Sequence, residues 1–221
     1  MINVAVLPFN SFQENTYVLS DETGACLIVD PGNNNDREDE KIAGYIEGNG
    51  LKPTLIVNTH GHVDHLLGVR FLQERYGIPL AMHGGDAFLL PQVPLQGRMY
   101  GFTISEVPVV DRDLADEKSL RFGNSELEIL HVPGHSPGHI ALYSRESEFV
   151  IVGDVLFRGS IGRTDLPGGD YHQLMTSIIG QILPLGGHIT VYPGHGRPTT
   201  ISQEVDRNPF IREVIDGEVN F

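Results

Sequence analysis

The feature that most constrains this chain is the segment Thr59-His60-Gly61-His62-Val63-Asp64-His65, which carries three imidazoles and one carboxylate within seven residues. An aliphatic run at residues 55–57 precedes it. The sequence therefore predicts a buried strand that ends near Asn58 and an exit loop that holds the cluster. Packing alone gives no reason for so many metal-binding groups at the end of a strand, so the segment predicts a metal site.

The spacing within this segment predicts that its side chains point in two directions. His60 and His62 lie two residues apart, and residues two apart share a face in an extended segment. Apolar residues with helical spacing follow from Leu66, so the chain is expected to turn into a helix near Asp64 and His65, which then point elsewhere. Two sets of ligands suit two adjacent metal ions. For any single histidine of this segment, the alternative to binding a metal is a hydrogen bond within a polar loop.

Length and composition predict an ordinary globular protein. With 221 residues, 40% hydrophobic and 20% charged, the chain is expected to form one domain over residues 1–221. No apolar run is long enough to cross a bilayer, so no membrane partner is expected. The first eight residues lack a basic region, and Cys26 is the only cysteine. Both features favour a cytoplasmic location.

The charge balance limits the partners. The chain has 15 basic and 29 acidic residues, a formal net charge of -14. Its average surface field repels polyanions, so nucleic acid is not an expected partner. A small-molecule substrate is expected instead, and the sequence leaves the oligomeric state open.

Helices are predicted to alternate with strands. The sequence predicts a helix that Asp36 caps, a short helix at residues 86–90 and a longer helix that Asp170 caps. Residues 91–108 show neither the helical nor the strand period of apolar residues. They are predicted to be an irregular loop that forms a wall of the substrate cleft. Apolar alternation and turn residues predict strands at residues 2–7, 16–19, 25–29, 78–82, 119–122, 127–132, 140–143, 149–152 and 189–192.

Three further candidate ligands lie beside glycines in loops that follow predicted strands: His135, Asp154 and His195. Such loops, widely separated along the chain, are expected to converge at one edge of packed sheets. The other histidines fit this pattern less well. For His131 and His139 two roles remain open: a hydrogen bond to a metal ligand, or a purely structural placement. His83 and His188 are expected in surface loops.

With these residues in order, the chain resembles the metallo-β-lactamase superfamily. It is similar to the short, single-domain, glyoxalase II-like branch through the stretches Phe12-Gln13-Glu14-Asn15-Thr16-Tyr17, Gly153-Asp154-Val155-Leu156-Phe157, Gly159-Ser160-Ile161-Gly162-Arg163-Thr164-Asp165, Pro193-Gly194-His195-Gly196 and Asn208-Pro209-Phe210. The resemblance implies an α/β fold (α+β in some schemes), a four-layer αβ/βα sandwich with the metal site at one edge.

The resemblance also implies a ligand set of seven residues. His60, His62 and His135 would hold the first metal. The second metal would be held by Asp64, His65 and His195, with Asp154 bridging the two. The expected cofactors are two divalent ions, zinc first, with iron or manganese as alternatives.

The activity that the resemblance implies is hydrolysis of thioesters, with S-lactoylglutathione as the leading substrate. A metal-bridging hydroxide would attack the carbonyl, and Asp64 would orient that hydroxide. Arg163 would bind a substrate carboxylate, with a structural salt bridge as the alternative. Two-domain glyoxalase II enzymes add a C-terminal helical domain that contacts glutathione. The sequence ends soon after His195, so weak saturation by glutathione thioesters is expected.

Three alternatives remain open. Persulfide dioxygenases resemble the Gly162-Arg163-Thr164-Asp165 stretch but use one iron and carry a cysteine shortly before it, where this chain has Ser160-Ile161. Lactone or β-lactam hydrolases would use the same metals, and the absence of a signal sequence disfavours the β-lactam case. A binding module braced by metals is the third, although structural zinc sites are usually closed and rich in cysteine.

Overall fold

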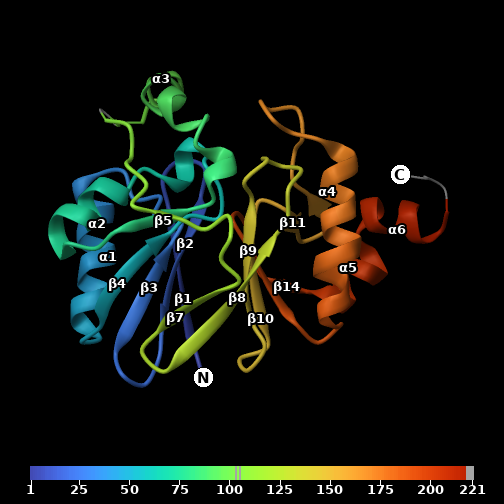
Figure 1. Cartoon of the computed structure of the whole chain (residues 1–221), viewed down its shortest axis with the longest axis horizontal. Coiled ribbons are helices and arrows are strands. Elements are labelled where there is room, and N and C mark those ends of the chain that lie inside the picture. Colours follow the sequence, from blue (N-terminus) through green and yellow to red (C-terminus); the bar gives the residue numbers. More distant parts are fainter. Residues whose placement is uncertain (103, 105, 218–221) are drawn as a thin grey trace.

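In the computed structural model, which describes residues 1–102, 104 and 106–217, two mixed six-stranded sheets pack face to face (Figure 1). The first sheet has the order β1 (Asn3–Phe9), β2 (Glu14–Ser20), β3 (Ala25–Val29), β4 (Lys52–Val57), β5 (Leu80–Met82), β6 (Arg112–Asp113). The second has the order β14 (Thr199–Thr200), β13 (Thr190–Pro193), β10 (Phe149–Gly153), β9 (Ile140–Ser144), β8 (Ser125–His131), β7 (Ser119–Phe122). A separate ribbon pairs β11 (Leu156–Phe157) with β12 (Ser160–Ile161).

Helices cover the two outer faces and complete four layers (Figure 1). The outer face of the first sheet packs against α1 (Asp36–Gly48) and α2 (Val69–Tyr76) through a cluster that includes Ile42, Ile56 and Leu72. The second sheet carries α4 (Tyr171–Ser177), α5 (Ile201–Arg207) and α6 (Pro209–Ile215) on a cluster that includes Leu174 and Ile211. The layered sandwich that the sequence predicts is therefore confirmed.

The core between the sheets follows from strand alternation. Leu27, Val29 and Val57 of the first sheet meet Leu142 and Ile151 of the second in one cluster of buried side chains. Residues two apart share a face of a strand, so alternate residues of β3 face this core and the outer helices. None of the helices in the described part of the chain has the length and apolar character needed to cross a bilayer.

Strand direction explains where the polar loops gather. β3, β4 and β5 run parallel in one sheet, as do β10 and β13 in the other, so their carboxyl ends lie at the same edge of each sheet. Backbone hydrogen bonds join the sheets at this edge, from Asn15 N to Gly194 O (2.7 Å) and from Ile140 N to Thr59 O (2.8 Å). Loops distant in sequence are thus held side by side.

The prediction of an irregular loop at residues 91–108 is wrong in its first half. A 3-10 turn at Leu90–Gln92 leads into α3 (Val93–Tyr100), which ends at Gly101 with a positive φ of 77°. Pro94 lies in the first turn of the helix, where the missing N–H has no intrahelical partner to lose. Within the predicted loop, residues 103 and 105 lie outside the described residues.

Helix boundaries near the site also differ from prediction. Asn35, not Asp36, caps α1, because it adopts an extended conformation and its side chain accepts a hydrogen bond from Glu38 N. The prediction of a short helix at residues 86–90 is wrong: two 3-10 turns, Gly84–Asp86 and Leu90–Gln92, overlap its ends, and residues 87–89 form a turn between them. The helix capped by Asp170 is confirmed, and it continues as a π-helix at Ile178–Ile182 and a 3-10 turn at Leu183–Leu185.

Candidate metal centre

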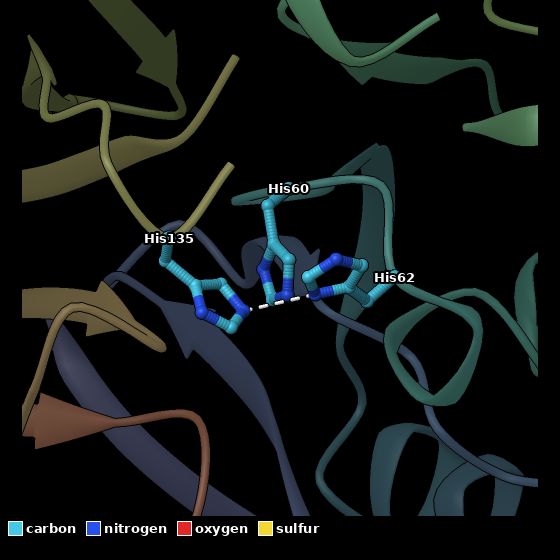
Figure 2. Close-up of side chains that lie close together, drawn as sticks. All are labelled: His60, His62 and His135. Carbon is cyan, nitrogen blue, oxygen red and sulfur yellow. Dashed lines mark hydrogen bonds between the residues drawn. The ribbon is translucent and has the colours of Figure 1, made fainter. Parts of the chain in front are cut away.

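Three histidines expected at the first metal lie together, and we call His60, His62 and His135 the first trio (Figure 2). Each offers a ring nitrogen, and these nitrogens lie within 4.8 Å of one another. His62 Nδ1 and His135 Nε2 are 2.9 Å apart, and the two rings are perpendicular. Two loops supply the trio, one after β4 and one between β8 and β9.

The second trio consists of Asp64, His65 and His195, whose ligand atoms also lie within 4.8 Å of one another. Asp64 and His65 come from a 3-10 turn at Val63–His65, and His195 follows β13. That turn confirms that the chain leaves the extended conformation after His62, although α2 itself begins only at Val69. His195 Nε2 is 3.2 Å from Asp64 Oδ2.

Asp154 stands between the trios. Its Oδ1 lies 3.6 Å from His65 Nε2, and its Oδ2 lies 3.7 Å from His135 Nε2 and 3.6 Å from His195 Nε2. One carboxylate therefore contacts members of both trios. This placement fits the bridging role that the resemblance implies.

Contacts at Nδ1 hold the orientation of four rings, and three of these contacts are hydrogen bonds. His135 Nδ1 donates to Arg163 O (2.7 Å) and His195 Nδ1 to Phe12 O (3.0 Å), because a carbonyl can only accept. His60 Nδ1 lies 3.0 Å from Thr59 Oγ1, and His65 Nδ1 lies 3.2 Å from an Asp30 oxygen. In each ring Nδ1 faces a protein oxygen, so Nε2 is the nitrogen left for a metal ion, which is the arrangement that metal-binding histidines show.

Burial and charge show that these residues fit metal ions. His60 Nε2, His62 Nε2, both nitrogens of His65 and Asp154 Oδ1 are buried without a hydrogen-bond partner among the described residues. Burial, with His135 next, lowers the pKa of His62 to about 3, and burial also lowers the pKa of His60, so both rings are neutral, the form that binds metals.

The second trio lies in a negative environment. Burial opposes a proton on His65, yet Asp64, Asp154 and Asp30 together raise the pKa of His65 well above its ordinary value. The position therefore favours a positive charge. The neutral rings of His60 and His62 in the first trio, and the carboxylates that attract a cation around the second, each suit a divalent ion.

Two buried aspartates support the site, and the sequence analysis missed both. Asp30 accepts hydrogen bonds from Thr59 N and Thr59 Oγ1, each 2.7 Å long, beside His65. Asp86 accepts from Gly61 N (2.9 Å), Ser136 Oγ (2.6 Å) and Gly138 N (2.6 Å). It therefore ties together the two loops of the first trio. Asp30 follows β3 and precedes Pro31-Gly32. It therefore shows the same sequence signal as the expected ligands, a loop with glycine directly after a strand.

Residues 10–17, which we call the N-terminal support segment, contact every member of the second trio. Asn10 Nδ2 donates to Asp64 O (3.2 Å), and the fully buried Glu14 places Oε1 3.8 Å from His65 Nδ1. Phe12 O accepts from His195, and Asn15 Nδ2 donates to Pro193 O (3.0 Å) and Gly196 O (2.8 Å) on either side of it.

Close approach to the site requires glycine at residue 194. A Cβ there would collide with Asp154 Oδ1 and lie 2.8 Å from His65 Cε1. Any larger residue would displace the bridging carboxylate or a ligand of the second trio.

A cavity of about 360 Å³ opens onto both trios. Its lining includes His62, His135, Asp154, Asp64 and His195. Arg163 also lines it, but its guanidinium forms a bidentate ion pair with Asp165, at 2.7 and 2.8 Å. The structure thus brings Arg163 to the cavity and gives it a partner within the chain.

Four of the five other histidines divide as follows. His139 Nε2 accepts from Asp154 N (3.1 Å) and its ring stacks on His60, so it contacts two of the expected ligands. His131 stacks on His83 with centroids 4.4 Å apart and lies 2.8 Å from Pro137 O, away from the trios. His83 is thus partly covered, whereas His188 is exposed as predicted.

The fold and this site define a family. The profile of the metallo-beta-lactamase superfamily matches residues 10–195, a range that contains all seven expected ligands. The chain therefore belongs to the metallo-β-lactamase superfamily, and its histidine and aspartate clusters are consistent with a binuclear metal site.

Several relatives are similar over almost their whole length. The hydroxyacylglutathione hydrolase GloC of Haemophilus influenzae is 37% identical over 95% of this chain and 98% of its own. The crystal structure of BLEG-1 B3 metallo-beta-lactamase superposes with a TM-score of 0.87 at 37% identity, covering 95% of this chain and 99% of that one. The crystal structure of TTHA1623 in a di-iron-bound form superposes with a TM-score of 0.82 at 37% identity, covering 93% of this chain and 99% of that one.

Proposed function

We propose that this chain is a metal-dependent hydrolase of thioesters, with S-lactoylglutathione as the leading candidate substrate. The observation that carries the proposal is the pair of trios joined by Asp154 on the wall of one open cavity. The 37% identity to a hydroxyacylglutathione hydrolase supports the choice of substrate.

The donor set favours catalysis over a purely structural role. Structural zinc sites are usually closed and rich in cysteine, whereas this one combines histidines with carboxylates and borders a cavity. The first trio and the second trio would each hold one ion, with Asp154 contacting both. Bound divalent ions would lower the pKa of a water towards neutrality and polarise a carbonyl oxygen. Zinc is our first choice, and the di-iron form of TTHA1623 keeps iron as an alternative.

The reaction consumes one water and needs little acid catalysis. A thioester RC(O)–SR′ and H₂O give RCOOH and R′SH, with the C–S bond broken and a C–O bond formed. The leaving thiolate has a pKa of about 8.5, so it departs without a strong proton donor. Asp64 Oδ2, held 3.2 Å from His195 Nε2, would orient the attacking water.

A β-lactam hydrolase is the second candidate, because BLEG-1 B3 metallo-beta-lactamase has the same level of identity as GloC. The same trios would serve it. Its leaving group is an amine, which is far more basic than a thiolate and must be protonated as it departs. The chemistry thus favours the thioester, and the assay must include both.

Turnover on a small panel tests the proposal. Protein reconstituted with zinc, iron or manganese would be assayed with S-lactoylglutathione, a lactone, a β-lactam and a persulfide, while thiol release and oxygen uptake are followed. We expect thiol release from the thioester without oxygen uptake. Oxygen uptake with the persulfide and no thioester cleavage would contradict the proposal, as would cleavage of the β-lactam alone. Metal-stripped protein is the control.

A further inference from the structure

The cavity beside the trios has a large apolar wall that metal binding does not explain. Six of its lining residues carry apolar or aromatic side chains: Phe12, Val63, Leu89, Tyr100, Leu166 and Pro167. They come from the support segment, the metal-ligand loop, the region of α3 and the loop after β12. Four separate parts of the chain thus bring apolar groups to the place where the reacting bond must lie.

The wall has a fixed base and an exposed rim. Leu89 and Val63 are 1% and 3% exposed, so packing holds them in place. Phe12 and Tyr100 are 41% and 49% exposed although their rings pack edge to face, 5.3 Å between centroids. Large aromatic side chains gathered at the mouth of a cavity and left open to solvent are a mark of an apolar ligand.

Charge argues against an anionic occupant for this part of the cavity. Apart from imidazoles, Arg163 is the basic side chain among the described lining residues, and Asp165 already neutralises it. The protein as a whole carries a formal charge of -14. A carboxylate-bearing group would therefore find no unpaired guanidinium or ammonium at this wall, whereas an apolar group would gain by leaving water.

We propose that this wall binds an apolar group, an alkyl chain or an aromatic ring, attached to the thioester that the trios cleave. The inference rests on the proposed function and deepens it. S-lactoylglutathione, whose acyl group is short and hydroxylated, is then a poorer substrate than thioesters with a larger apolar group. The apolar group belongs to the acyl or the thiol side of the bond, and the two sides are distinguished experimentally.

Two substrate series test the proposal on the reconstituted enzyme. The first lengthens the acyl chain from acetyl to hexanoyl on N-acetylcysteamine, and the second lengthens the alkyl thiol of an acetyl thioester. In one of the series kcat/KM should rise about fourfold per added methylene, the value expected when each is buried. The series that responds identifies the side. A flat response in both series would overturn the proposal.

Variants of the wall locate the effect. Tyr100→Ala and, separately, Leu166→Ala should lower kcat/KM for the longest substrate about tenfold and leave the acetyl substrate within about twofold. Met99→Ala is the matched control, because Met99 lies on the same helix, is 72% exposed and is not among the lining residues. Equal losses for short and long substrates in both wall variants would contradict the proposal.

Direct binding separates this proposal from the proposed function. Calorimetry with S-methylglutathione and S-hexylglutathione, which cannot be hydrolysed as thioesters, reports the apolar wall without turnover. We expect the hexyl compound to bind at least tenfold more tightly, and Tyr100→Ala to remove the difference. If no thioester is cleaved but this difference holds, the proposed function fails and the apolar site stands. If thioesters are cleaved but kcat/KM is flat in both series, or if the methyl and hexyl compounds bind equally, the apolar site is wrong.

Discussion

The first trio and the second trio lie side by side but depend on different parts of the fold. The first consists of three imidazoles, and Asp86 ties its two loops together within one network. The second includes a carboxylate, is surrounded by further acids, and is held by the N-terminal support segment. Its His195 side chain is 25% exposed, whereas His60 is fully buried.

This difference teaches that the two trios can be weakened separately. The first owes its geometry to buried hydrogen bonds between its own loops. Contacts that cross more than 180 residues of sequence, such as His195 to Phe12 O, position the second. Asp154 contacts members of both trios, and Asp30 lies close to His60 of the first and His65 of the second. Variants should therefore fall into three classes: those that affect both trios, the first alone, or the second alone.

The largest effect is expected at Asp154. The difference between the two trios does not matter there, because both trios lose a partner. Asp154→Ala should reduce the metal content from two ions per chain to less than one and lower hydrolysis by on the order of 10³-fold. Elemental analysis and thioester turnover measure the two effects. Asp206→Ala, at an exposed acid remote from the trios, is the control. Retention of both ions in Asp154→Ala would refute the bridging assignment.

A change at Asp86 should act on the first trio. Asp86→Asn keeps the size of the side chain but turns one acceptor oxygen into a donor, so at least one of its three hydrogen bonds is lost. We expect the affinity for one of the two ions to fall by about 10- to 100-fold while the other is retained. Competition with a chelator measures the affinity for each of the two ions separately. Equal weakening of both would mean that the trios are not independent.

A matched pair of glycine variants tests the second trio. Asn10 and Gln13 both have positive φ, 50° and 55°, so glycine is tolerated at either position without strain. Asn10→Gly removes the donor to Asp64 O and should weaken one ion about tenfold. Gln13→Gly removes an amide that donates to Asn10 O and should leave both affinities within about twofold. Identical affinities in the two variants would exclude this support role.

The smallest effect is expected at Arg163, which lies outside both trios. If its guanidinium exchanges Asp165 for a substrate carboxylate, Arg163→Ala raises KM about threefold to tenfold with little change in kcat. The ion pair with Asp165 is exposed, so its loss should change the melting temperature little. Steady-state kinetics with S-lactoylglutathione and with a neutral thioester measure this. A loss confined to kcat would assign Arg163 a different role.

The alternation of strands with helices and the convergence of the ligand loops could be predicted from local rules, whereas the four-layer sandwich and the ligand set of each trio were implied by the resemblance to a family. His60, Asp154 and His195 each lie in a loop that follows a strand, and parallel strands bring their carboxyl ends to one edge. Asp86 and Glu14 could not be recognised, because their partners lie far away in the sequence and neither follows that pattern. The ligand roles themselves stay predictions until metal is measured.

The helix α3 was missed for a different reason. Pro94 and Gly97 lower intrinsic helix propensity, and the local pattern shows no apolar stripe. In the structure Gly97 packs closely against Ile104, where any Cβ would collide with the isoleucine side chain, and Val93 is fully buried. Tertiary packing therefore overrides the local preference. A short window of sequence does not contain that packing information.

The measurement that tests the account most directly is the number of metal ions per chain. Protein purified without chelator and supplemented with zinc or manganese would be dialysed and analysed for metal and protein content. The account predicts two ions per chain in the native protein, one retained in Asn10→Gly at a chelator concentration that leaves the native protein loaded, and fewer than one in Asp154→Ala. A single ion per native chain, even after supplementation, would contradict the binuclear site.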